Sequence, residues 1–377
     1  MTHANPESLI DWSSAARVAG RIAPPGPIGS RVELQALVDE LRIAAERAWA
    51  PAVEFSGLAN LIGDEAPIAP VYVVDRAGWA VANSESMARL SAPLLGDLPA
   101  QRASAQVLGT VEAAGILALL STKVLGQFDP YGPSSGRLLL IAPNILDVES
   151  VIGAPASDFR QWVCLHELTH AAQFRAAPWL ADHLVSLISD LGSKTDPEED
   201  EAPDEPATLG DLAQGKAATA AADAIAGFAA GVVRAGRIVR SGVQAARGKG
   251  QAGLMDGFLG PRQQARLAEL TAIMALLEGH ADVTMDAVGP EVIGSIDQLR
   301  EDFDNKRDSA KGMAKVFARV FGMEAKLAQY RNGAEFVRGV QHQAGVEALS
   351  AAWAAPQNLP RAEEIADPAA WIARVLG

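Results

Sequence analysis

The five residues from His166 to His170 read HELTH, with two histidines four positions apart and a glutamate directly after the first. Residues i and i+4 of an α-helix share one face, so both imidazole rings can present a nitrogen to a single point. Two such nitrogens fill half of the tetrahedral set that zinc prefers. Glu167 lies beside that face, where it can take a proton from a water activated by the metal. The pattern predicts a helix with a zinc site; the alternative is a helix whose histidines bond only within the core.

A third zinc ligand is expected on a second helix. The longer pattern with a glycine and a third histidine is excluded, because Gln173 and Ala176 occupy those positions. Glu278 and Asp282 are again four positions apart, within an apolar helical stretch where an unpartnered carboxylate would be costly. We expect Glu278 to complete a set of three ligands for one Zn2+ per chain. Asp282 would accept the second N–H of a ligand histidine and fix its ring.

Two other residues near these motifs can be assigned from their positions. His280 is two residues after Glu278, about 200° around the helix, so it faces away from the metal if Glu278 faces it. Cys164 precedes His166 by two positions, and we interpret it as a small buried hydrophobe rather than a thiolate ligand. It is the only cysteine, which excludes an internal disulfide.

The charge composition disfavours two classes of binding partner. The chain has 46 acidic and 32 basic residues, a formal charge of -14, which disfavours nucleic acid and anionic membrane surfaces. Hydrophobic residues make up 49% and charged residues 21%, as in a packed protein. The N-terminal residues lack the pattern of a secretory signal, and no long uncharged apolar run occurs. We expect a cytoplasmic protein without stable membrane insertion.

The chain is expected to form one large domain, 1–377, of the α+β class and predominantly helical. A small sheet is predicted from a hairpin between Ile68 and Val81 and from a buried strand at Arg137–Ile141. The N-terminal α+β part spans about 31–150, and the helical part with the metal site spans about 151–377. Helices are predicted over 31–49, 103–125, 158–177, 179–191 and 261–286, with a short one near Trp371.

An acidic segment interrupts the helical part at 192–207. Its core reads DPEEDEAPDE, which repels itself and has little to bury, so a mobile loop is expected. An acidic interaction segment is the alternative.

Four segments resemble a known family. HELTHAAQF, LLEGHADVTMDAVG, GMEAKLAQYRNGAEFV and LPRAEEIADPAAWIARV are similar to the actinobacterial predicted zinc-dependent metallopeptidases, zincin-like hydrolases labelled coenzyme F-420 biosynthesis-associated. The resemblance implies a zincin-like metallopeptidase fold with the HExxH motif on its active-site helix and the gluzincin ligand pattern. By that pattern His166, His170 and Glu278 match the ligands and Glu167 the catalytic base. Asp282 matches the acid behind the ligands. No deazaflavin site is expected.

The expected activity is hydrolysis of a peptide bond or similar amide in a peptide or protein substrate. Tyr330 is the candidate donor to the oxyanion formed in the reaction. By analogy with such folds, the strand Arg137–Ile141 is expected to align the substrate as an edge strand. The alternatives are an aminopeptidase or other amidohydrolase, and a non-catalytic helical interaction protein with a degenerate or structural zinc site.

Overall fold

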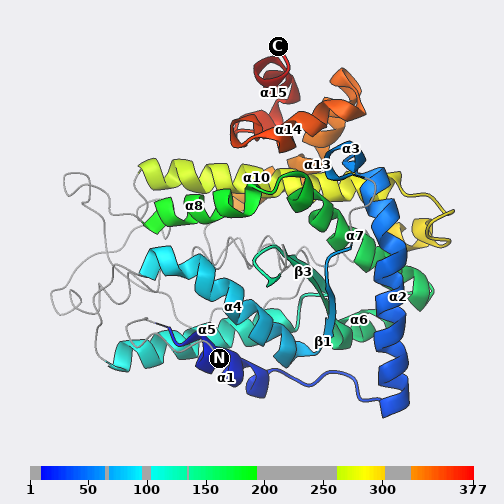
Figure 1. The fold of residues 1–377 in the computed structure, drawn as a ribbon, viewed down its shortest axis with the longest axis vertical. Coiled ribbons are helices and arrows are strands. Elements are labelled where there is room, and N and C mark those ends of the chain that lie inside the picture. The colour runs from blue at the N-terminus through cyan, green and yellow to red at the C-terminus, as the bar shows by residue number, and fades with distance from the viewer. Residues whose placement is uncertain (1–9, 64–67, 96–102, 134–135, 193–260, 302–323) are drawn as a thin grey trace.

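The computed structural model describes residues 10–63, 68–95, 103–133, 136–192, 261–301 and 324–377. Within these residues, helices surround a small sheet near the middle of the molecule (Figure 1). The α+β class with helix predominating is therefore confirmed. The division of the chain into one domain stays a prediction. The acidic segment lies outside the described residues except for Gly192.

Among the described residues the sheet has three strands, β1 (Val71–Val74), β2 (Gly126–Asp129) and β3 (Arg137–Ile141), in the order β1-β3-β2. The central strand β3 runs parallel to β1 and antiparallel to β2. All five residues of β3 are buried, as the run of leucines predicts. The sequence did not predict β2, because Gly-Gln-Phe-Asp has no apolar alternation.

The predicted hairpin between Ile68 and Val81 is wrong in its second half. Its first strand is β1, but Trp79 to Val81 lie in α4 (Arg76–Leu95). Asp75 begins this helix, because its Oδ1 accepts the Gly78 N–H at 2.6 Å. A short acidic residue followed by a glycine suits a turn and a helix N-cap alike, and here it forms the cap.

Most predicted helices are present, with shifted ends. The helix predicted over 31–49 continues to Phe55, and the one predicted to reach Leu125 ends at Ser121. The sequence did not predict α1 (Trp12–Ile22), α3 (Ala59–Ile62) or α6 (Ala142–Glu149), and α4 was not expected because its start was assigned to the hairpin. The other α-helices of the described residues are α2 (Arg31–Phe55), α5 (Ala103–Ser121), α7 (Ala156–Ala176), α8 (Leu180–Gly192), α10 (Pro261–Ala287), α13 (Glu324–Ala344), α14 (Ser350–Ala354) and α15 (Pro368–Val375).

The sheet separates two hydrophobic cores. Leu139 and Ile141 of β3 face a core shared with α4, α8, α10 and α13. Leu138 and Leu140 face the other core, which α2 and α7 fill. This alternation places the four apolar residues of the central strand in one core or the other. None of the described helices combines the length and the apolarity needed to cross a membrane.

Candidate metal site

Helices α7 and α10 bring three of the predicted residues together. His166 and His170 lie one turn apart on α7, and Glu278 approaches them from α10. Nε2 of His166 lies 3.7 Å from Oε2 of Glu278, and Nε2 of His170 lies 3.7 Å from Oε1 of the same carboxylate. The three ligand atoms all lie within 4.8 Å of one another.

This arrangement fits a zinc ion. Two ligands about 2.0–2.1 Å from a tetrahedral ion are about 3.4 Å apart, close to the measured 3.7 Å. Two imidazole nitrogens and one carboxylate oxygen are also the donor types that catalytic zinc takes. Within the described ranges the cluster has three members, which would leave a fourth position for water or substrate.

Glu167 lies between this cluster and the sheet. Its Oε2 accepts the N–H of Phe128 at 3.1 Å. A Cβ at Gly126 would lie 2.6 Å from Cγ of Glu167, so only glycine allows the carboxylate to come this close to β2. In the metal-free protein, burial raises the pKa of the Glu167 carboxyl to about 7, and Glu278 adds to the rise, while His170 and the Phe128 N–H oppose it. The group can therefore accept and release a proton near neutral pH.

Gln173 orients the ring of His170 through a hydrogen bond to Nδ1. Nδ1 of His170 bonds to Oε1 of Gln173 at 2.9 Å, which leaves Nε2 toward Glu278. Burial alone would lower the pKa of His170, but Glu278 and Glu167 outweigh it, so the pKa lies above its ordinary value in the metal-free protein. Asp282 acts in the same direction from one turn further along α10.

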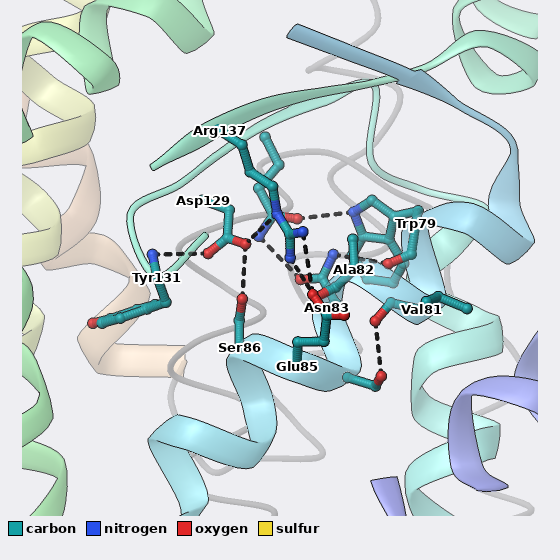
Figure 2. A network of polar contacts seen from close by, with 11 residues as sticks. Trp79, Val81, Ala82, Asn83, Glu85, Ser86, Asp129, Tyr131 and Arg137 are labelled. Atoms are coloured by element: carbon teal, nitrogen blue, oxygen red, sulfur yellow. Dashed lines mark hydrogen bonds and ion pairs between the residues drawn. The ribbon is translucent and has the colours of Figure 1, made fainter. Parts of the chain in front are cut away.

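A polar network holds β2 in register beside Glu167. Asp129, at the end of β2, accepts hydrogen bonds from Arg137 Nε at 3.0 Å and Ser86 Oγ at 2.7 Å. Figure 2 shows the Arg137 guanidinium between Asp129 and α4, where it also donates to the carbonyl of Ala82. Both charged groups are buried, so each needs the other. The network therefore connects the edge strand β2 to both β3 and α4.

The expectation that Arg137–Ile141 is an edge strand is wrong. Strand β3 has hydrogen-bonded neighbours on both sides, so its backbone cannot pair with a substrate. Edge strand β2 is the one that contacts α7 beside Glu167. No sequence pattern indicated this edge, because residues 126–129 show no alternation of apolar and polar residues.

Two glycines bring α10 and α13 into backbone contact beside the cluster. A Cβ at Gly279, next to Glu278, would lie 2.1 Å from the carbonyl carbon of Gly333. A Cβ at Gly333 would lie 2.1 Å from the carbonyl oxygen of Ala275. Tyr330 belongs to α13, but its side chain lies outside the described part of the protein, so its predicted role stays a prediction.

Sequence reasoning missed two buried side chains behind the cluster. His280 is not a member of the metal cluster in the described ranges, and burial lowers its pKa to about 4. However, its Nδ1 lies 3.0 Å from Nε2 of Gln173, which connects it to His170. The position of Gln173, three residues after His170, is a local signal for the contact between Gln173 and His170, but not for the contact with His280.

Comparison with known proteins agrees with this geometry. A model of the zincin-like metallopeptidases matches residues 10–372, so the chain belongs to that family. The structure is also similar to a solved structure of a "putative hydrolase with a novel fold" from Chloroflexus aurantiacus, with 25% identity and a TM-score of 0.64. That alignment covers 97% of this chain and 98% of the other. No curated protein matches the chain. These findings support a zinc-binding hydrolase.

Proposed function

We propose that this protein is a gluzincin-type metallopeptidase, a zinc-dependent hydrolase of peptide bonds. The observation that carries the proposal is the cluster of His166, His170 and Glu278, with Glu167 buried beside it. Family membership supports the hydrolase class. The peptide substrate, the roles of the individual residues and a cytoplasmic location are our proposals.

The residues divide the chemistry between them. Zinc, held by His166, His170 and Glu278, would supply Lewis-acid activation of water and of the scissile carbonyl. Glu167 would take the proton from the attacking water and later deliver it to the leaving amine. Burial, which favours the neutral carboxyl, makes Glu167 a better proton acceptor than an exposed glutamate. The Phe128 N–H holds the carboxylate in one orientation.

The edge of β2 is the proposed place for the substrate backbone. An extended peptide beside β2 would lie near Glu167, with the Phe128 N–H kept by that carboxylate and not used by the peptide. Tyr330 remains the proposed donor to the oxyanion. Because Gln173 occupies Nδ1 of His170, the proposed role of Asp282 in orienting a ligand now concerns His166.

A non-catalytic protein with a structural zinc site would be organised differently. Structural sites are closed by four protein ligands, whereas the cluster has three members in the described ranges. Such a site also has no use for a buried carboxylate that lies beside the ligands without being one of them. The structure therefore favours the catalytic proposal.

The test compares zinc binding and peptide cleavage in two variants. Glu167→Gln should keep zinc and lose about 10²–10⁴-fold in the rate of cleavage of a peptide library. Glu46→Gln is the matched control, since Glu46 is exposed on α2, and it should cleave as the unmodified protein does. Cleavage by Glu167→Gln at the unmodified rate would overturn Glu167 as the base. A zinc-loaded protein that cleaves no peptide of the library would overturn the substrate class.

A further inference from the structure

A chain of buried hydrogen bonds leads from the end of α2 to the metal cluster. His280 Nε2 lies 2.9 Å from the backbone oxygen of Ser56, and His280 Nδ1 lies 3.0 Å from Gln173 Nε2. Gln173 Oε1 lies 2.9 Å from His170 Nδ1. Gln173 is fully buried, and His280 is 2% exposed. Polar groups that are buried this deeply need hydrogen-bond partners within the protein. Each contact therefore needs one donor and one acceptor, which determines where the hydrogens lie.

The direction of the chain is fixed at its far end. The backbone oxygen of Ser56 can only accept, so Nε2 of His280 must carry the hydrogen between them. Nδ1 of a neutral His280 is then an acceptor, and it faces the amide nitrogen of Gln173, which can only donate. The Trp353 ring packs on His280 with the ring centroids 5.3 Å apart, which holds the imidazole in this orientation.

A second carbonyl fixes the orientation of the Gln173 amide. Gln173 Nε2 also donates to the backbone oxygen of Leu277 at 2.9 Å. Exchanging the oxygen and nitrogen of the amide would set its oxygen against that carbonyl, so the exchange is excluded. Both hydrogens of the amide are used, one toward Leu277 and one toward His280. Gln173 Oε1 is therefore left as the acceptor for His170.

The orientation of the Gln173 amide determines the tautomer of the proposed metal ligand His170. Since Gln173 Oε1 can only accept, His170 must carry a hydrogen on Nδ1. In the neutral imidazole, Nε2 then has its lone pair free, and Nε2 is the atom that lies 3.7 Å from Glu278. The same Gln173 side chain ties α7 to the carbonyl of Leu277, the residue before Glu278. The Gln173 side chain thus orients the ring of the ligand His170. It also connects α7 to α10, the two helices that carry the three proposed ligands.

We infer that Gln173, supported by His280, is a positioning residue that holds His170 in the Nδ1–H form and presents Nε2 to the metal. The part of the inference that concerns metal binding rests on the proposed function. The hydrogen-bond pattern itself does not depend on the metal. Neither residue touches the metal, so both act through His170. Partners of this kind, placed behind metal ligands, commonly change metal affinity by 10–100-fold when they are removed.

The direct test is the tautomer of His170 in the metal-free protein. Nitrogen-15 labelling of the six histidines and proton–nitrogen correlation NMR, at a pH above the pKa of His170, distinguish the two forms. The unmodified protein should show hydrogen on Nδ1 only. Gln173→Ala should show hydrogen on Nε2 in a substantial fraction of molecules. Where that variant does not fold, Gln173→Met keeps the side-chain length and removes both bonding groups.

Zinc affinity gives the second readout, measured by competition with a chromophoric chelator. Gln173→Ala should bind zinc about 10–100-fold more weakly, and His280→Phe should weaken binding in the same direction. Gln161→Ala is the matched control, because Gln161 is also on α7 and also donates to a backbone carbonyl, that of Val292. It should change neither readout.

The outcomes separate this inference from the proposed function. If His170 keeps its tautomer in Gln173→Ala and zinc affinity stays within twofold, the positioning role is overturned. If the unmodified protein binds no zinc, the proposed function fails. In that case the tautomer comparison still decides whether Gln173 sets the ring of His170.

Discussion

The contact between Gly279 and Gly333 allows a sharp test of how the site is built. An alanine at position 279 would place its Cβ 2.1 Å from the carbonyl carbon of Gly333 and 2.5 Å from the amide nitrogen of Ala334. Carbon atoms normally approach to about 3.5–4.0 Å, so α10 and α13 would have to separate by about 1.5 Å. The clashing atoms are backbone, which cannot rotate away. Gly279→Ala should therefore strain the whole crossing of the two helices.

The expected magnitude follows from two opposing effects. Overpacking costs about 1–3 kcal/mol, and a clash between backbones belongs at the upper end, about 3 kcal/mol. Replacing a glycine inside a helix by alanine ordinarily stabilises by about 1 kcal/mol. The free energy of unfolding should therefore fall by about 2 kcal/mol. Because Glu278 is adjacent, zinc affinity should fall as well.

Gly115→Ala is the control for this test. A Cβ at Gly115, inside α5, would meet no atom of the described residues within 4 Å, so only the helix preference should act. This variant should gain up to about 1 kcal/mol. Urea denaturation followed by tryptophan fluorescence compares the two. A Gly279→Ala protein as stable as the unmodified one would refute the close crossing of α10 and α13.

Three further predictions concern the ion pair of Asp129, the thiol of Cys164 and the carboxylate of Asp282. Asp129→Ala should destabilise the protein by about 3–5 kcal/mol, because it leaves the buried Arg137 without its buried partner. Glu85→Ala removes an exposed partner of the same arginine and should cost about 0–1 kcal/mol; equal losses in urea denaturation would contradict this assignment. Burial raises the pKa of the Cys164 thiol, so native protein should resist maleimide at neutral pH and react after unfolding; rapid native labelling would contradict the burial. Asp282→Ala should weaken zinc binding by about 10–100-fold in chelator competition, and unchanged affinity would remove Asp282 from the support of the ligands.

The histidine pair of the cluster could be predicted from the sequence because its spacing is local. Four-residue spacing places His166 beside His170 in any α-helix, whatever the rest of the fold. The approach of Glu278 could be anticipated because a carboxylate in an apolar helix needs a partner. The connection of His280 to His170 could not be predicted, since it depends on how α7 crosses α10.

The sheet shows where local signals end. Strand β3 could be predicted from its run of buried apolar residues. Strand β2 could not, because its four residues are extended through pairing with β3 rather than through their own preference. The same limit explains the error at Asp75, where the residue types of a turn and of a helix N-cap coincide.

The most direct test of the account is the metal content of the purified protein. Mass spectrometry after removal of adventitious ions should find about one zinc per chain, and a variant with both His166→Ala and His170→Ala should lose it. A protein that retains no zinc, and takes up none on reconstitution, would contradict the zinc site on which the proposed function depends.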